Sequence, residues 1–234
     1  MVNAASLHDD KINIAIDGPA GAGKSTIARK VANKLGYIYV DTGAMYRAAT
    51  LYFVGKGIEP QDETVIAEAL EGLDIELQPG EDRQQVFVNN KNVTDEIRSI
   101  KVNTVVSQYA QIEALRSRLV DLQRQMAERK GVVMDGRDIG TTVLPHAEVK
   151  IFMTASVEER AARRYKEMTE KDQITLEQLM HDIAERDRLD QGREISPLTQ
   201  AKDAILLDTT SMTIEQVVDT IISYCNMQGM GSKR

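Results

Sequence analysis

The sequence predicts an α/β fold in which a mainly parallel sheet is covered by helices on both faces. Short apolar and β-branched runs alternate along the chain with segments of helical spacing, and this alternation is typical of parallel sheets. A glycine-rich loop joins the first such run to the first helical segment. Residues 73–93 differ, because short alternating runs are separated there by two turn sequences. This stretch predicts a small antiparallel β insertion.

Residues 12–35 carry the most specific pattern in the chain. Isoleucines at positions 12, 14 and 16 predict a strand, and apolar residues that recur until Gly36 predict a helix. Between them, residues 18–25 have the spacing G-x-x-x-x-G-K-S of a P-loop. Glycines let backbone N–H groups surround a phosphate chain, and we expect Lys24 to reach its β- and γ-phosphates and the Ser25 hydroxyl to ligate Mg²⁺. The alternative, a glycine-rich turn that binds nothing, is disfavoured because strand, spacing and helix agree.

The composition excludes several classes of protein. The formal net charge of −7 argues against a general nucleic-acid binder and against a binder of anionic membranes. The single cysteine, Cys225, excludes an intrachain disulfide and a cysteine zinc cluster. No apolar run is long enough to span a membrane, and residues 1–11 lack the apolar core of a signal peptide. We therefore expect one domain over residues 11–227 in a reducing cytoplasm, with no nucleic acid and no membrane as partner.

The remaining elements follow from apolar runs, helical spacing and turn residues. Further strands are predicted at residues 37–40, 132–134, 149–153 and 204–208. Helices are predicted at residues 44–56, 62–70, 95–130, 175–190 and 213–225, and in the arginine-rich segment after residue 153. Thr213 is expected to cap the closing helix.

Polar residues directly follow three of the predicted strands. These clusters are Asp17-Gly18, Asp41-Thr-Gly43 and Asp135-Gly-Arg-Asp138. In open parallel sheets, ligands bind beyond the carboxyl ends of the strands. We therefore expect all three clusters to open onto one crevice.

The clusters at residues 41–43 and 135–138, with the helix that follows residue 43, contain candidate anion-binding residues. Each candidate also has an alternative interpretation. Thr42 and Arg47 would hold a phosphate distinct from those of ATP, or would be a helix N-cap and a surface arginine. Arg137 would grip a phosphate while Asp138 accepts from an amine or a ribose hydroxyl, or the two would form an internal ion pair. Asp135 is a candidate for positioning a metal ion or its waters.

A later helix carries charged residues at a regular spacing. Arg186, Asp190 and Arg193 share one face if the helix continues that far. On spacing alone, the favoured interpretation is a solvated face with Asp182–Arg186 and Arg186–Asp190 pairs.

An arginine cluster opens the helix after residue 153. Arg160, Arg163 and Arg164 place many positive charges on one short element, which favours a visiting anion such as a phosphoryl group. The alternative is partial neutralisation by the nearby glutamates Glu158, Glu159 and Glu167. Ser107 and Arg116 lie on charged helices without a local signal, so spacing alone makes them surface residues.

Several motifs, in this order, resemble those of bacterial cytidylate (CMP) kinases, which are P-loop nucleoside monophosphate kinases. The motifs are residues 18–25, Asp41-Thr-Gly-Ala-Met-Tyr-Arg47, Asp135-Gly-Arg-Asp-Ile-Gly140, Glu159-Arg160…Arg163-Arg164 and Glu185-Arg186…Asp190…Arg193…Pro197-Leu198. The resemblance runs from about residue 12 to the closing helix. It implies a P-loop kinase fold in which residues 68–98 form an inserted monophosphate-binding lobe and residues 156–193 a helical lid.

The resemblance also implies roles for individual residues. The ATP phosphates would be held by Gly18, Pro19, Ala20, Gly21, Ala22, Gly23, Lys24, Ser25 and Thr26. CMP would be bound by Arg47, Arg137 and Arg193 at its phosphate, by Ser107, Arg116 and Asp138 at cytosine, and by Arg186 and Asp190 at the ribose, with Thr42 lining the site. The catalytic groups would be Lys24, Arg137, Arg193, Arg163 and Arg164. Mg²⁺ would be held by Ser25, with Asp135 acting through water.

The implied reaction is in-line transfer of the ATP γ-phosphoryl group to CMP or dCMP by a monomeric enzyme with Mg²⁺. Two rival functions stay open. One is a different small-molecule P-loop kinase, acting on AMP, UMP or shikimate. The other is a nucleotide switch without catalysis, which is disfavoured because the chain has neither a D-x-x-G nor an N/T-K-x-D guanine-reading motif.

Overall fold

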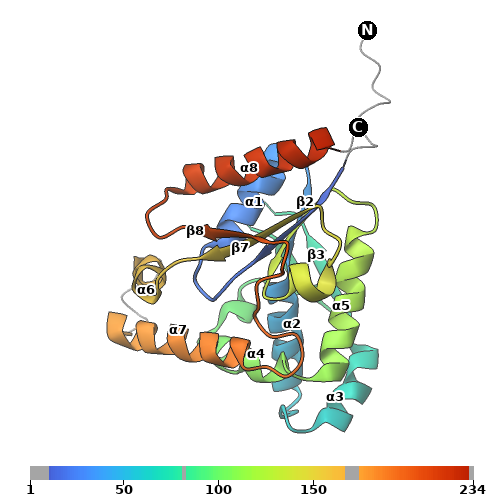
Figure 1. Cartoon of the computed structure of the whole chain (residues 1–234). Helices are drawn as coiled ribbons and strands as arrows, with labels where there is room; N and C mark the ends of the chain where they lie inside the picture. Colours follow the sequence, from blue (N-terminus) through green and yellow to red (C-terminus); the bar gives the residue numbers. More distant parts are fainter. Residues whose placement is uncertain (1–10, 81–82, 167–173, 232–234) are drawn as a thin grey trace.

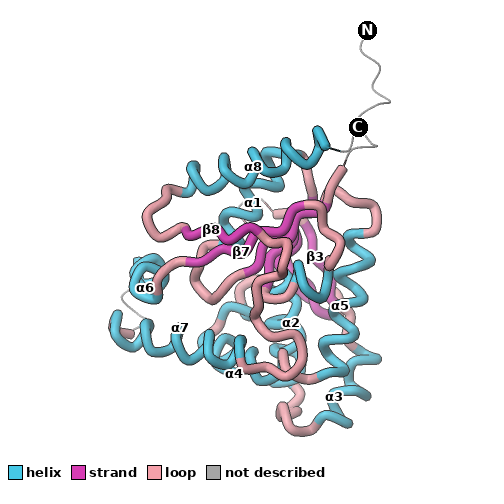
Figure 2. Tube along the Cα trace, viewed as in Figure 1, coloured by secondary structure: helices cyan, strands magenta, loops and turns pink. Residues whose placement is uncertain are grey.

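The computed structural model describes residues 11–80, 83–166 and 174–231, and a five-stranded parallel sheet forms its centre (Figure 1). The strand order is β2-β6-β1-β7-β8, with bounds Ile38–Asp41, Val132–Gly136, Asn13–Asp17, Val149–Thr154 and Ile205–Asp208. Figure 2 shows strands in magenta among cyan helices. The predicted α/β fold with a parallel sheet is confirmed. Residues 1–10 and Glu167, which the sequence analysis mentioned, lie outside the described residues.

Helices cover both faces of the sheet (Figure 1). One face carries α1 and α8 and the other α2, α4 and α5, with bounds Lys24–Leu35, Ile214–Gly231, Thr42–Gly55, Ile100–Tyr109 and Glu113–Ala127. Ile14 and Ile16 share a buried core with α1 and α8, whereas Ala15 lies in the core on the other side. α8 has the predicted cap, because Thr213 Oγ1 accepts from the backbone N–H of Gln216 at 3.2 Å.

The predicted antiparallel insertion is a separate three-stranded sheet of order β3-β4-β5. Its strands span Ile75–Gln78, Gln85–Val88 and Lys91–Asn92, and it is flanked by α3 (Glu63–Ala69) and the short turns η1 (Leu70–Gly72) and η2 (Glu96–Arg98). Ile75 pairs with Val88 across β3 and β4, and both are buried with Val86 in the core that contains α2 and α5. The insertion is therefore packed onto the main body through an apolar face.

The continuous helical segment predicted for residues 95–130 is wrong, because the chain bends between α4 and α5. Ile112 has an extended backbone (φ −72°, ψ 120°) and precedes α5. Tyr109 ends α4, and its hydroxyl donates to the carbonyl of Ile58 at 2.6 Å. Both Tyr109 and Ile112 are buried. The bend lets both helices place apolar faces on one core, which helical spacing alone did not reveal.

Two helices, α6 (Val157–Lys166) and α7 (Leu176–Gln191), pack against each other through a small cluster of Ala161, Leu179 and Ile183 (Figure 1). α7 ends at Gln191, so Arg193 does not continue its face as the spacing required. The chain turns back after Gly192, and the backbone N–H of Leu198 donates to the carbonyl of Asp190 at 2.8 Å. This turn still returns Arg193 toward Asp190.

The strand register brings the three polar clusters to one edge of the sheet, as predicted. Asp41 of β2 lies opposite Asp135 of β6, and Asp17 of β1 lies opposite Gly136. The Asp17 carboxylate accepts backbone N–H groups at 2.7 and 2.8 Å from the start of the π-helical turn η3 (Ile139–Val143), so it anchors the loop after β6. None of the helices in the described part of the chain combines the length and apolarity that a membrane crossing needs.

Candidate active site

The P-loop wraps over the end of β1 with left-handed backbone at three glycines. Gly18, Gly21 and Gly23 have φ values of 150°, 74° and 83°. At Gly18 the approach is close, because a Cβ would lie 2.1 Å from the carbonyl oxygen of Met153. α1 then begins at Lys24, so its unpaired N–H groups open onto the loop. This is the strand, loop and helix arrangement that the sequence predicted.

Lys24 is buried within this loop, and its Nζ donates to the carbonyl of Pro19 at 2.8 Å. Burial and the nearby charge of Arg137 together lower the pKa of Lys24 to about 7, against the opposing effect of the charges of Asp135 and Asp17. An anion in the loop would counter this desolvation and restore the charge of the lysine. The electrostatics of the loop are therefore those of an anion-binding site.

Asp135 joins the loop to its surroundings through both carboxylate oxygens. Ser25 Oγ donates to Oδ2 at 2.9 Å, and the Tyr39 hydroxyl donates to Oδ1 at 2.9 Å. Burial raises the pKa of Asp135 to about 6, and the charge of Asp41 acts in the same direction. Tyr39 was not predicted as a site residue, although it lies two positions before Asp41 on the same strand and so shares its face.

The hydroxyl of Ser25 and the carboxylate of Asp135 are oxygen ligands of the kind that Mg²⁺ prefers. Within the described residues, no group of three or more histidine, cysteine, aspartate or glutamate side chains could hold a metal ion. The donor set fits a cation that takes most of its ligands from phosphate oxygens and water.

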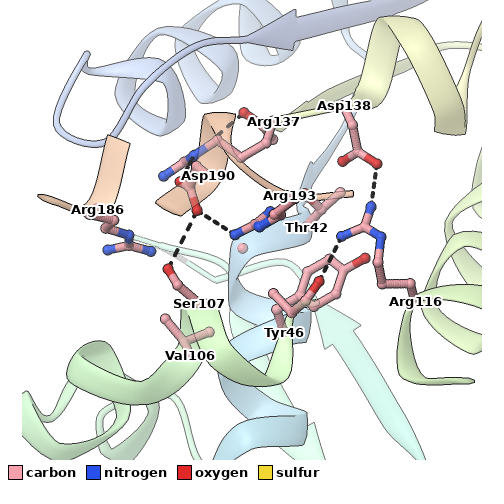
Figure 3. Close-up of a pocket in the computed structure, with 13 residues that line it drawn as sticks. Thr42, Tyr46, Val106, Ser107, Arg116, Arg137, Asp138, Arg186, Asp190 and Arg193 are labelled. Atoms are coloured by element: carbon pink, nitrogen blue, oxygen red, sulfur yellow. Dashed lines mark hydrogen bonds and ion pairs between the residues drawn. The ribbon is translucent and has the colours of Figure 1, made fainter. Parts of the chain in front are cut away.

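A second pocket lies beside the loop and is formed by α2, α4, α5, α7 and the residues after β6 (Figure 3). Its lining residues are Thr42, Gly43, Tyr46, Val106, Ser107, Ala110, Arg116, Gly136, Arg137, Asp138, Arg186, Asp190 and Arg193. Spacing alone had assigned Ser107, Arg116 and the face formed by Arg186, Asp190 and Arg193 to the surface. The structure brings all five residues together in this pocket. The guanidinium groups lining it make it suited to a phosphorylated ligand.

Asp190 is the centre of the charges in this pocket (Figure 3). Its carboxylate accepts from Arg137 Nε at 2.8 Å, from Arg193, and from Ser107 Oγ at 3.4 Å. Burial alone would raise the pKa of Asp190, but Arg137, Arg193 and Arg186 outweigh burial and hold this pKa below its usual value. Asp190 is only 1% exposed, so the solvated helix face that spacing favoured is wrong for this residue.

Arg186 lines the pocket without the ion pairs that the solvated face, favoured on spacing alone, required. No Asp182–Arg186 or Arg186–Asp190 ion pair is present within the described residues; Asp182 accepts instead from Gln178 at 2.9 Å. Burial lowers the pKa of Arg186 to about 9, and the charge of Arg137 adds to this effect. Its buried Nε has no hydrogen-bond partner among the described residues. A desolvated guanidinium with an unsatisfied N–H group is suited to bind an anionic or hydroxyl-bearing ligand.

Asp138 pairs with Arg116, so the alternative of an internal Arg137–Asp138 pair is wrong. Arg116 also donates to the carbonyl of Ala110 at 3.0 Å, and its guanidinium lies over the ring of Tyr46, 5.5 Å from the centroid. Burial raises the pKa of Asp138 and the charge of Arg116 opposes that rise. One acceptor and one planar donor therefore lie together at a wall of the pocket.

The start of α2 carries the two residues predicted for a second phosphate. Asp41, and not Thr42, is the N-cap, because its Oδ1 accepts from the backbone N–H of Ala44 at 2.7 Å. Asp41 Oδ2 also holds Arg47 at 3.2 Å. Thr42 Oγ1 donates to the carbonyl of Asp135 at 2.7 Å. Thr42 is therefore not the capping residue, and Arg47 is not a surface arginine. Thr42 is buried and Arg47 is partly buried.

The arginines of α6 do not line this pocket. Arg163 Nε pairs with Glu159 at 2.9 Å, and Arg163 Nη2 donates to the carbonyl of Thr209 at 2.7 Å. Arg164 is exposed. Arg160 is buried and contacts Asp187 and the P-loop. Neutralisation by Glu159, one of the alternatives, therefore holds for Arg163 in this conformation.

Comparison with known proteins identifies the family. A family profile described as "Cytidylate kinase" matches residues 14–227. The chain belongs to the cytidylate kinase family. A cytidylate kinase of Exiguobacterium sibiricum is 54% identical over 209 residues, covering 89% of this chain and 94% of the relative. A cytidylate kinase of Bacillus subtilis is 52% identical over 215 residues, covering 92% of this chain and 96% of the relative.

A solved structure supports the fold alone. A protein of Eubacterium ventriosum, described as uncharacterized, superimposes with a TM-score of 0.51 and 11% sequence identity, covering 93% of this chain and 99% of that chain. The resemblance to cytidylate kinases seen in the motifs is thus confirmed by the family match and not by this structural similarity.

Proposed function

We propose that this member of the cytidylate kinase family transfers the γ-phosphoryl group of ATP to CMP and dCMP, giving ADP with CDP or dCDP. The observation that carries this proposal is the position of Asp135 between the two sites. Its carboxylate accepts from Ser25 of the P-loop at 2.9 Å, and its carbonyl accepts from Thr42 of the second pocket at 2.7 Å. Two bound nucleotides would therefore meet at the end of β6, as direct transfer requires.

The donor nucleotide is proposed to bind at the P-loop. Its phosphates would accept from the backbone of residues 18–26, with Lys24 leaving the carbonyl of Pro19 to pair with them. Ser25 would hold Mg²⁺, with Asp135 acting directly or through water. When bound, Mg²⁺ neutralises the charge that accumulates on the transferred phosphoryl oxygens.

The acceptor phosphate is proposed to lie among Arg47, Arg137 and Arg193. Arg137 and Arg193 now share Asp190, and Arg47 is held by Asp41, so all three keep a carboxylate partner. An arriving phosphate would accept from their remaining N–H groups, since each guanidinium has five donors.

Recognition of cytosine is proposed to rest on Asp138, Arg116 and Ser107. Cytosine has an exocyclic amine that donates and a ring edge that accepts. The Asp138 carboxylate would accept from the amine, while Arg116 and Ser107 would donate to the ring edge. Uracil has a carbonyl in place of that amine, and this carbonyl would face the carboxylate and be disfavoured. The ribose hydroxyls would bond to Arg186 and Asp190, and Thr42 would line the site.

The chemistry needs no covalent intermediate on the protein, because the acceptor phosphate already carries nucleophilic oxygens. Catalysis would consist of alignment and charge neutralisation by Lys24, Arg137 and Arg193. Arg163 and Arg164 would join them only if the 156–193 segment moves, since Arg163 is held by Glu159 and Thr209. Closure of this segment as a lid, and of residues 68–98 as the acceptor lobe, would exclude water from the transfer.

The proposed working unit is a monomer with one domain over residues 11–227, because one chain supplies both the P-loop and the residues that line the acceptor pocket. The proposed compartment is the cytoplasm, where the buried thiol of Cys225 stays reduced.

A coupled assay with ATP, Mg²⁺ and a panel of acceptors tests the proposal. We expect ADP formation with CMP and dCMP at a kcat/KM roughly 10,000-fold above that with AMP, the size of discrimination that a site built to hydrogen-bond its substrate provides. UMP is expected to fall between them. A higher kcat/KM with AMP or shikimate would assign a different kinase, and no ADP formation with any acceptor would favour the nucleotide switch.

A further inference from the structure

Two buried side chains outside the acceptor pocket enclose the backbone of Ala20 in the P-loop. Arg160 of α6 and Asp187 of α7 form an ion pair of 2.7 Å between NH1 and Oδ2. The backbone N–H of Ala20 donates to Asp187 Oδ1 at 3.2 Å. Arg160 NH1 donates to the carbonyl of Ala20 at 2.8 Å. Both polar groups of this residue are therefore bonded to one ion pair.

The ion pair is itself held in place. Arg160 Nε donates to the carbonyl of Ala155 at 2.9 Å, which orients the guanidinium plane. The loop packs directly on the two helices, since a Cβ at Gly21 would lie 3.3 Å from the Cβ of Arg160 and 3.8 Å from Cδ1 of Ile183. A loop of glycine and alanine residues has few side chains that can fix its backbone conformation. The contacts with Arg160 and Asp187 therefore restrain the backbone of the P-loop.

We propose that Arg160 and Asp187 are positioning residues for the donor site. By fixing both polar groups of Ala20, they keep the following N–H groups of the loop directed at the donor phosphates before ATP arrives. Preorganisation of this kind increases affinity because less order must be created on binding. The inference deepens the proposed function and rests on the assignment of the P-loop to ATP.

The same pair relates the donor loop to the acceptor pocket. Asp187 lies on α7 between Arg186 and Asp190, which line that pocket. Neither Arg160 nor Asp187 is among the lining residues. The pair therefore acts through the loop backbone and not on the acceptor itself, which predicts an effect on ATP binding larger than that on CMP binding.

The test compares Asp187→Leu, Asp187→Asn and the double variant Arg160→Met/Asp187→Leu with the unaltered chain. ATP affinity is measured without turnover, by displacement of a fluorescent ATP analogue, and stability by thermal unfolding. We expect Asp187→Leu to weaken ATP binding by about tenfold, which corresponds to about 1.4 kcal/mol. Asp187→Asn keeps an acceptor for Ala20 and should lose less. The KM for CMP should change by less than about threefold, an effect below about 0.7 kcal/mol.

The double variant separates positioning from plain stability. It removes both charges, so no unpaired arginine stays buried and much of the melting temperature lost in Asp187→Leu should return. ATP affinity should not return with it. The matched control is Glu185→Gln, which breaks the exposed Glu185–Arg188 pair on the same helix and should leave ATP affinity unchanged.

Three results would overturn the inference. Unchanged ATP affinity in Asp187→Leu and the double variant would do so, as would a double variant that regains affinity together with stability. Equal losses for ATP and CMP would also contradict a role in the loop alone. Absence of ATP binding by the unaltered chain is a different outcome, because it refutes the donor-site assignment and the inference with it.

Discussion

The carboxylate of Asp190 accepts a hydrogen bond at 2.8 Å from Nε of Arg137, a residue 53 positions away in the sequence. Arg193 bonds to the other oxygen of the same carboxylate. One buried carboxylate thus stabilises two guanidinium groups of the pocket. Four arginines and two aspartates line the pocket, and this excess of positive charge favours an anionic ligand.

Replacing Asp190 by alanine should destabilise the chain as well as impair the acceptor site. It leaves the buried Arg193 and the partly buried Arg137 without their carboxylate. Breaking a buried pair in this way costs about 3–5 kcal/mol. The free energy of unfolding in urea measures this loss. Asp182→Ala, on the exposed side of the same helix, should change that free energy by less than about 0.5 kcal/mol. Equal unfolding free energies for the two variants would contradict the central place of Asp190.

Replacing Arg137 by alanine should impair use of CMP while ATP binding stays intact. Loss of charge-assisted hydrogen bonds worth about 1.5–3 kcal/mol corresponds to roughly a 10- to 100-fold fall in kcat/KM for CMP. Steady-state kinetics with each substrate varied in turn measure the two effects separately. Arg188→Ala provides the control, since Arg188 is exposed and pairs only with Glu185 among the described residues. Unchanged CMP kinetics in Arg137→Ala would refute its assignment.

Binding of ATP should be accompanied by proton uptake. Burial lowers the pKa of Lys24 to about 7 in the ligand-free loop, and phosphates restore it toward the usual lysine value. In the free protein Lys24 is then about half charged at pH 7 and mostly neutral at pH 8, and in the complex it is charged. Uptake is therefore roughly half a proton at pH 7 and approaches one at pH 8. Calorimetric titration with Mg²⁺-free ATP in buffers of different ionisation enthalpy measures it.

The sign of that effect is fixed by the direction of the pKa change. A group whose pKa rises on binding takes up protons between the two pKa values, so affinity should fall as pH increases above about 7. Lys24→Arg, which stays charged throughout, should abolish most of the uptake. Binding heats that do not depend on the buffer would show that Lys24 is already charged in the free protein.

Removing the hydroxyl of Tyr39 should weaken the proposed Mg²⁺ site. The hydroxyl fixes one oxygen of Asp135 at 2.9 Å, and loss of such outer partners typically lowers metal affinity about 10- to 100-fold. The Mg²⁺ concentration needed for tight binding of an ATP analogue should therefore rise in Tyr39→Phe. Tyr37→Phe is the comparison variant, because its hydroxyl accepts from the backbone of Ile12, away from the site. An identical Mg²⁺ requirement in both variants would remove Tyr39 from the site.

The parts of the site that could be predicted from sequence are those set by local pattern. The P-loop lies within one strand, loop and helix. Asp17 and Asp41 each end a strand of the parallel sheet, and Asp135 is the last residue but one of another. The rule that strand ends meet at one edge was enough to bring these residues together. The register that pairs Asp41 with Asp135 agrees with it.

The parts that local pattern missed depend on contacts between distant segments. Ser107 donates to Asp190 across 83 positions, and Arg116 pairs with Asp138 across 22, so neither has a signal within its own helix. Helical spacing assigned Arg186 to a solvated face because it does not say which face a neighbouring helix covers. The family resemblance identified these residues where spacing could not.

Tyr39 and Asp187 were found by neither route. Aromatic residues such as Tyr39 are common in strands, so its position in the sequence gives no sign of a role in the site. Only its hydrogen bond to Asp135 shows that role. Asp187 lies in a helix rich in charged residues, and its partner Arg160 is on another helix. Residues that support a site through contacts with distant parts of the chain can be recognised only from the three-dimensional structure.

The claim that two nucleotides meet in one cleft is tested most directly with a compound that joins adenosine and cytidine through a pentaphosphate chain. If both sites open onto the end of β6, this compound should bind roughly 100-fold or more tighter than ATP or CMP alone. Calorimetry measures its dissociation constant, and both Lys24→Ala and Arg137→Ala should remove the gain. An affinity no higher than that of ATP, unaffected by Arg137→Ala, would contradict the account.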